Sequence, residues 1–295
     1  MRVNPNPMPD LLAATSETQQ QINTDLEQLA SGRSINRPSD NPVGAAMLVR
    51  NAAKTGETDQ FLRSASGLSG EMQNADSALS SVITILQRAI SLGVEGANGT
   101  ANSSERASLA AEIQGIQSEL INLANLSYQG NFVFAGTATQ TAPYVSDSTS
   151  ASGVRYVGNA EVNSVTVGDH LTVKANLPGS DLFTSPGSDV FQALQDLVTN
   201  LQSGSNIDGA VNEVNAAYQH ISTQRVFFGN AINQLDAQQT FLNSQSTQLA
   251  AQENTICGAD LPKVISELVN AETSREATLS AVSKTQQANL FDYIK

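Results

Sequence analysis

The sequence predicts a mainly α-helical protein: an elongated antiparallel helical bundle or coiled coil built from both chain ends, with a small β-rich insert in the middle. Three observations support this fold class. Apolar residues recur at alternating steps of three and four toward both ends of the chain, and the period shortens to about two only in the middle. A joint that contains proline and glycine sets off each terminal segment.

The N-terminal segment, residues 1–42, is predicted to be a helical arm that ends in a fixed turn. One face of the helix carries Leu11, Thr15, Thr18, Ile22, Leu26 and Leu29. Gly32 suits the left-handed position that follows a helix, while Asn41 and Pro42 suit the cap and first turn of the next helix. Because Pro38 disfavours helical angles at the residue before it, the backbone itself enforces the turn.

The predicted helical body comprises residues 43–137 and 183–257. Its clearest heptad seam runs through Ala65, Leu68, Met72, Ala75, Leu79, Val82, Leu86 and Ala89. A second helix carries a similar seam from Leu109 and is expected to stop near Tyr128. A long final run covers residues 207–249, and we expect the seams of 65–89 and 207–235 to pack within one chain.

The middle of the body is interrupted by a predicted β insert, residues 138–182. The stretch SVTVGDHLTVKANL predicts two strands around a turn at Gly168 and Asp169. Serine, threonine and glycine fill the joints between the short strands. We therefore expect a small outward-facing module.

The C-terminal segment, residues 258–295, is predicted to be a second helical arm that forms the assembly core together with residues 1–42. The stretch GADLP precedes it, and Val264, Leu268, Leu279 and Val282 mark its seam. Fully burying a large apolar side chain contributes about 1.5–3 kcal/mol, while ordering each residue costs about 1–2 kcal/mol. Arms with so few apolar residues are marginal by themselves, so the seams of 11–29 and 264–290 are expected to pack against neighbouring subunits.

Composition and motifs exclude several function classes. The formal net charge of −13 disfavours nucleic acid and anionic membrane surfaces as partners. No stretch predicts a cleaved secretion signal or a membrane span. Cys257 is the single cysteine, and His170 and His220 lie in no catalytic or metal-binding motif. We therefore expect no enzyme activity, no catalytic residue, no metal and no cofactor.

Four motifs in order carry a family resemblance over essentially the full length. They are MRVNPN at the start, LASGRSINRPSDNPVGAA, SYQGNFVFAGTATQTAPY and, at the end, SELVNAETSREATLSAVSKTQQANLFDYI. With them the chain resembles the flagellin superfamily, and within it the hook–filament junction proteins. Flagellins proper usually have an alanine-rich stretch where this chain has PSDNPVG, and they end differently from FDYI.

The resemblance implies a structural protein that self-assembles into a ring-like layer of the bacterial flagellum. Its implied partners are hook-associated protein 1 on the hook side, flagellin on the filament side, further copies of itself, and an export chaperone before secretion. It implies an extracellular location reached by the flagellar type III pathway. The residues expected at assembly contacts are Leu11, Ile22, Leu26, Leu29, Arg33, Asn36, Pro38, Asp40, Leu268, Leu279, Val282, Leu290, Phe291 and Tyr293.

Two other functions fit the same pattern of helices. The nearer alternative is a minor flagellin built into the filament itself. The more distant one is a cytosolic coiled-coil binding module, which shares the heptad seams but would not be part of flagella.

Overall fold

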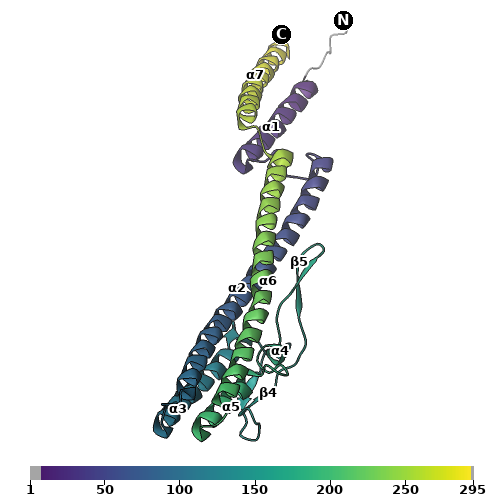
Figure 1. Ribbon diagram of the computed structural model, residues 1–295. Coiled ribbons are helices and arrows are strands. Elements are labelled where there is room, and N and C mark those ends of the chain that lie inside the picture. The colour runs from purple at the N-terminus through teal and green to yellow at the C-terminus, as the bar shows by residue number, and fades with distance from the viewer. Residues whose placement is uncertain (1–7, 294–295) are drawn as a thin grey trace. The chain divides into compact units, whose positions relative to one another are not determined.

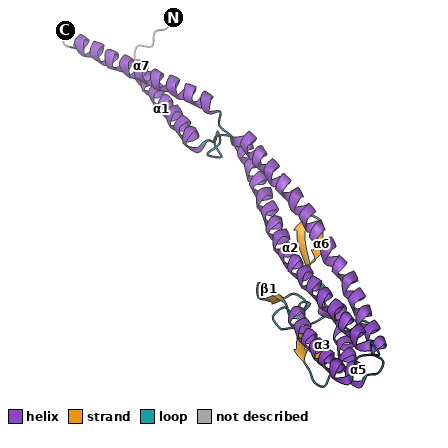
Figure 2. Ribbon diagram, turned by 60° about the vertical axis from the view of Figure 1, so that its left-hand side comes forward, coloured by secondary structure: helices purple, strands orange, loops and turns teal. Residues whose placement is uncertain are grey.

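Helices dominate the chain, and the prediction of a mainly α fold with a small β insert is confirmed. The computed structural model describes the backbone of residues 8–293 and the side chains of residues 8–284. Its helices are α1 (Met8–Ser31), α2 (Pro42–Ala97), α3 (Ser103–Ala124), α4 (Gly179–Leu182), α5 (Val190–Ser203), α6 (Ile207–Cys257) and α7 (Leu261–Tyr293), as Figures 1 and 2 show. The last helix begins smoothly because Pro262 lies in its first turn, where its missing N–H costs no helical hydrogen bond.

The chain forms two compact units. The terminal unit comprises Met1–Glu57 and Gln245–Lys295, and the middle unit comprises Thr58–Ser244. Both boundaries fall inside the continuous helices α2 and α6 rather than at the joints that contain proline and glycine. Each unit is described by itself below.

The helices of the middle unit enclose one apolar core, as the heptad seams predict. The α2 seam is buried from Ala65 to Ala89, and it packs with residues of three other helices, including Ile113 and Leu120 of α3, Leu194 and Leu197 of α5, and Val214, Ile221 and Phe228 of α6. Polar contacts at the edge fix the pairing of α2 with α6: the Arg225 guanidinium donates two hydrogen bonds, of 2.6 and 2.8 Å, to the Asp76 carboxylate. These bonds raise the pKa of Arg225 above its usual value.

Close approach between helices explains two glycines of α2. A Cβ atom at Gly93 would lie 2.6 Å from a methyl group of Val211, and one at Gly96 would overlap Leu201. Any larger residue would therefore push α5 or α6 away from α2. The sequence pattern predicts a loop, GVEGANGTANSS, that begins at Gly93, and this prediction is wrong for its first residues because α2 continues to Ala97.

The β region consists of short antiparallel hairpins, and the first of them precedes the predicted insert of residues 138–182. The described strands are β1 (Ser127–Tyr128) with β2 (Asn131–Phe132), β3 (Tyr144–Ser146) with β4 (Val154–Tyr156), and β5 (Ser164–Gly168) with β6 (Leu171–Lys174). Gly168 pairs with Leu171, so the turn residues of the last hairpin are Asp169 and His170, one position later than predicted. A register irregularity between Thr166 and Gly168 accounts for this difference.

The helix before the insert ends earlier than its apolar pattern predicts. It stops at Ala124 and not near Tyr128. The reason is a side chain: the Asn125 amide donates to the carbonyl oxygen of Tyr144 and accepts from its N–H, both at 2.8 Å. The Asn125 side chain thus makes the pair of hydrogen bonds that a neighbouring strand would make with β3, and the helix ends at the residue before it.

The β insert is anchored in the apolar core of the middle unit by a buried tyrosine. Tyr144 is 2% exposed, and its hydroxyl donates to the carbonyl oxygen of Gly179 at 2.7 Å. Its ring packs against Phe183 and Phe191, with centroids 5.8 and 5.0 Å away, and Phe134 links this cluster to Phe228 of α6. Burial raises the pKa of Tyr144. Five aromatic side chains therefore join the insert to the helices.

Helix α2 contains a more apolar stretch than the sequence patterns suggest. One 18-residue window has a mean hydropathy of 1.4, which by length and composition alone would suffice for a membrane span. Much of that apolar character belongs to the buried seam around Leu79, Val82 and Leu86, which packs in the helical core. Within the structure 39% of that window is buried, so core packing accounts for part of its apolar character.

Candidate functional site: the clasp between the chain ends

The two terminal helices lie along each other within the terminal unit. Helix α1 packs on α7, and the two helices run antiparallel because the end of α1 meets the start of α7 (Figures 1 and 2). Their facing sides carry Ile22, which is 4% exposed, and Val264, also 4% exposed. Arg275 reaches across from α7 and donates to the Gln19 amide oxygen at 3.1 Å. The pairing of first and last segments thus uses one face of each helix.

Hydrogen bonds tie the two joints directly to each other. The N–H of Ser34 donates to the carbonyl oxygen of Cys257 at 2.6 Å, and the N–H of Ala259 donates to that of Gly32 at 3.0 Å. Arg33 lies opposite Gly258 in an isolated antiparallel bridge. The Arg33 guanidinium also forms a 2.8 Å ion pair with Glu253. We call residues 32–34 with Glu253 and Cys257–Ala259 the clasp.

The turn that follows the clasp is organised by one carboxylate. Asp40 accepts hydrogen bonds from the N–H groups of Arg37, at 2.7 Å, and Asn36, at 3.0 Å. These bonds, that from Arg37 first, lower the pKa of Asp40 below its ordinary value. The Asn36 amide in turn donates to the carbonyl oxygen of Arg33 at 3.0 Å, which links the turn to the clasp. The Asn- and Asp-rich composition of the turn thus gives it a fixed conformation.

Local backbone chemistry ends one helix and begins the next, as the sequence predicts. Gly32 has a φ of 68°, and its N–H donates to the Gln28 carbonyl oxygen at 2.8 Å. The Asn41 side chain accepts from the N–H of Gly44 at 2.9 Å and so caps α2. Ile35, 8% exposed, packs so closely over Gly44 that a Cβ there would lie 2.5 Å from its terminal methyl group. This contact holds the turn against the start of α2.

The structure sorts the predicted assembly residues into three groups. Arg33, Asn36 and Asp40 form the clasp and the turn, and Pro38 lies exposed in the same turn. Leu11, Ile22, Leu268 and Val282 are partly or fully buried on the described helices, whereas Leu26, Leu29 and Leu279 are exposed, by 47%, 37% and 49%. The side chains of Leu290, Phe291 and Tyr293 lie outside the described residues, although helix α7 continues to Tyr293.

Sequence reasoning missed the α6 side of the clasp. Glu253, Cys257 and Gly258 contribute an ion pair, a carbonyl acceptor and a backbone bridge. The only sequence signal was the glycine in GADLP. The structure explains it, because a Cβ at Gly258 would overlap the carbonyl oxygen of Asn254. Asp25 was missed too, because a carboxylate is not expected on a buried face, yet it is 1% exposed.

Exposed apolar side chains concentrate in the terminal unit. Of the large apolar residues exposed in the described chain, Val94, Val162, Val226 and Phe241 belong to the middle unit. The terminal unit holds the other ten: Leu12, Leu26, Leu29, Val43, Met47, Val49, Leu261, Ile265, Val269 and Leu279. It does so with 108 of the 295 residues. A surface this apolar is typical of an interaction site.

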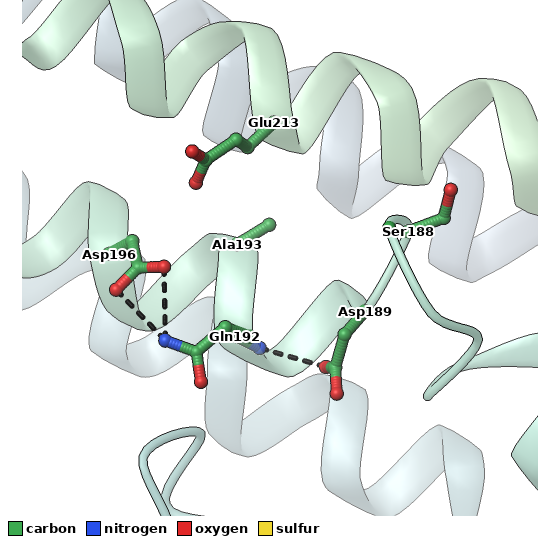
Figure 3. A pocket seen from close by; sticks show the side chains of 7 residues that line it. Ser188, Asp189, Gln192, Ala193, Asp196 and Glu213 are labelled. Carbon is green, nitrogen blue, oxygen red and sulfur yellow. Dashed lines mark hydrogen bonds between the residues drawn. The ribbon is translucent and has the colours of Figure 1, made fainter.

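One cavity of the middle unit is lined by three carboxylates, two of which accept hydrogen bonds from Gln192. Figure 3 shows this cavity of about 380 Å³ beside the start of α5. Asp189 caps the helix by accepting from the N–H of Gln192 at 2.9 Å, Asp196 accepts from the Gln192 side chain, and Glu213 approaches from α6. Burial raises the pKa of Asp189. Nowhere among the described residues do three potential metal-ligating side chains gather in a metal-binding group.

The fold thus defines a helical protein whose two chain ends pair with each other through a clasp. Two family models match these same regions: the bacterial flagellin N-terminal helical region matches residues 8–139, and the C-terminal helical region matches residues 211–294. The chain belongs to the bacterial flagellin family.

Known relatives place the chain among flagellar proteins. It is 26% identical to flagellar hook-associated protein 3 of Escherichia coli (strain K12), over 91% of this chain and 92% of the relative. It is also 26% identical to a flagellin of Listeria innocua, over 88% of this chain and 87% of the relative. Among solved structures, flagellar hook-associated protein 3 of Legionella pneumophila superposes with a TM-score of 0.64 at 14% identity, covering 70% of this chain and 98% of that one. The last likeness concerns the fold alone.

Proposed function

We propose that this chain is a junction protein of the bacterial flagellum, which joins the hook to the flagellin filament by assembling into a ring-like layer. The observation that carries the proposal is the pairing of the chain ends in a unit that holds ten of the fourteen exposed large apolar residues of the described chain. The name of the Escherichia coli relative, which is matched over nearly its whole length, supports the junction role.

The proposed contacts divide between the two faces of the terminal helices. One face of α1 and α7 is used within the chain, around Ile22 and Val264. The exposed residues Leu26, Leu29 and Leu279 remain for neighbouring subunits, with hook-associated protein 1 on one side of the layer and flagellin on the other. The clasp and its turn set the direction in which each chain offers this surface.

The chain reaches this place, in our proposal, by export through the flagellar type III pathway. An export chaperone would cover the apolar C-terminal segment in the cytoplasm, because Leu261, Ile265 and Val269 are exposed along α7. The role is structural, without catalysis, metal or cofactor. It involves neither nucleic acid nor membrane, in keeping with a net charge of −13.

The experiment that tests the junction role is a deletion of the gene in the source bacterium. A junction protein is required before any filament forms, so deletion should leave hooks without filaments and release flagellin into the medium. Complementation with the wild-type gene is the control. Filaments of near-normal length on the deletion strain would contradict the proposal.

The alternative of a minor flagellin has less support: the Listeria innocua flagellin has the same 26% identity as the hook-associated protein, but over a smaller share of both chains. It predicts the opposite phenotype, because losing one of several flagellins leaves filaments in place. The cytosolic coiled-coil module predicts that washed flagella lack the protein altogether.

A further inference from the structure

A polar cavity in the middle unit contains a carboxylate that has no counter-charge. The cavity, of about 380 Å³, lies between Glu71 of α2 and the β insert, whose residues Val133, Asn163, Val165 and Asn176 line it. Its apolar walls come from the two valines, while the amides provide polar atoms. It is separate from the clasp, whose residues belong to the terminal unit.

Glu71 is half-buried in this cavity and has no partner. No described residue donates a hydrogen bond to its carboxylate or forms an ion pair with it. Burial alone raises the pKa of Glu71. A carboxylate that is partly removed from water without compensation destabilises the isolated chain, so the cavity is not explained as a structural polar network.

The amides around Glu71 are already engaged with one another. The Asn176 side chain, 4% exposed, accepts from the N–H of Asn163 at 2.7 Å and donates to the carbonyl oxygen of Glu161 at 3.2 Å. The Asn131 side chain accepts from Gln140 at 2.6 Å. The walls are thus held in place, and Glu71 is the group that lacks an interaction. A preformed cavity with one unpaired charge suits a ligand of opposite charge.

The residues of the cavity favour one kind of cation over another. A metal ion is disfavoured because the site offers one carboxylate, and the described residues hold no group of metal ligands. A planar guanidinium suits a carboxylate better, since it can donate two parallel hydrogen bonds while its aliphatic stem packs on apolar walls such as Val133 and Val165.

We propose that the Glu71 cavity binds the guanidinium of an arginine that a second copy of this chain presents. Two exposed arginines of α2, Arg50 and Arg63, take part in no hydrogen bond or ion pair with described residues. A contact between an α2 arginine of one copy and the cavity of the next is heterologous, which is the kind of contact that builds rings and layers. The choice of a second copy rests on the proposed function, whereas the cationic ligand rests on the cavity alone.

The cationic ligand is tested on the full-length monomer by carbon-13 NMR of the Glu71 carboxyl group. The probe is N-acetyl-arginine methylamide, and the matched control is its uncharged citrulline analogue. We expect saturable binding of the arginine probe, a fall of the Glu71 pKa toward its ordinary value, and at least tenfold weaker binding by the citrulline probe and by Glu71→Gln. Equal binding of the two probes, equal binding by the variant, or preferential binding of a neutral sugar such as glucose would overturn the assignment.

The second copy is tested by charge exchange in cells. Glu71→Arg should export normally and lose filament attachment, and adding Arg50→Glu or Arg63→Glu should restore attachment at least tenfold. If neither double variant restores filament attachment, the arginine does not come from a second copy of this chain. The source would then be another protein. The probe titration does not depend on where the protein sits in the flagellum, so it can succeed even if the junction role is refuted.

Discussion

The N–H of Ser34 donates a 2.6 Å hydrogen bond to the carbonyl oxygen of Cys257, a residue 223 positions further along the chain. The Ser34 hydroxyl donates to the same oxygen at 3.1 Å. One carbonyl therefore accepts two hydrogen bonds where the N-terminal turn meets the end of α6. The two joints are therefore one structural element.

Gly258→Ala should open the clasp. The added Cβ would overlap the carbonyl oxygen of Asn254, and moving the backbone should cost about 1–3 kcal/mol. Amide hydrogen exchange at Ser34 and Ala259 should accelerate, because both N–H groups donate across the clasp. The matched control is Gly229→Ala in α6, where a Cβ meets open space and should stabilise the helix by up to about 1 kcal/mol. Unchanged exchange in the Gly258 variant would show that the clasp does not depend on this residue.

Asp40 should titrate below the ordinary aspartate value of about 3.9. Its pKa is lowered by the N–H groups of Arg37 and Asn36, so its contribution to the turn is present above the unfolded-state pKa and is lost as the pH falls through the lower folded-state value. The amide proton shifts of Asn36 and Arg37 should follow that transition in an NMR titration. A midpoint at the ordinary value would mean that the turn does not hold the carboxylate.

Tyr144→Ala should destabilise the middle unit by about 3–5 kcal/mol, because it removes a ring that is 2% exposed from the aromatic cluster. Tyr144→Phe should cost about 1 kcal/mol, through the hydrogen bond to Gly179. Since burial raises the pKa of Tyr144, its stabilising contribution is full below the ordinary tyrosine value of about 10 and declines above it. Chemical denaturation at pH 7 and pH 11 measures both effects. An alanine variant as stable as wild type would show that the insert is independent of the core.

Two substitutions on α1 separate contacts within the chain from contacts between subunits. Ile22→Asp places a charge where the side chain is 4% exposed, and it should lower the free energy of unfolding of the terminal unit by more than about 3 kcal/mol. Leu29→Asp changes a residue that is 37% exposed, so monomer melting should barely change while filament attachment fails in cells that export the protein. If Leu29→Asp lowers the melting temperature as much as Ile22→Asp, the exposed face is already used within the chain.

Asp25→Leu should stabilise the pairing of α1 with α7. Asp25 is 1% exposed, and although one carboxylate oxygen accepts from Gln21 at 2.7 Å, the other has no partner among the described residues. Replacing it with an apolar group should contribute about 1–3 kcal/mol in chemical denaturation. Glu17→Leu, at an exposed position of the same helix, is the control and should change little. A destabilised Asp25 variant would mean that the second oxygen does have a partner.

The sequence supports the fold well because the heptad seam from Ala65 to Ala89 is strongly periodic and is buried as predicted. It is less informative about the terminal helices, since α1 has apolar residues on more than one side. The three- and four-residue steps assigned Leu26 and Leu29 to the same face as Ile22, but the structure exposes both and buries Asp25. A spacing pattern cannot choose between two weak apolar stripes when the buried one contains a carboxylate.

The clasp was beyond prediction for a different reason. The turn around Asp40 follows from local chemistry, because asparagine, aspartate and proline favour hydrogen-bonded turns. The bonds from Ser34 to Cys257 and from Ala259 to Gly32 join backbone groups, which carry no side-chain signal in the sequence. The Asn125 side chain that ends α3 at β3 is likewise visible only once the two segments are side by side.

The central claim is that this chain forms the layer between hook and filament, and gold labelling of intact flagella tests it most directly. Antibody against the middle unit, detected with gold particles in the electron microscope, should mark one position at the hook end of each filament. Label distributed along the filament would contradict the junction role and identify a minor flagellin, and absence of label from washed flagella would place the protein outside the flagellum.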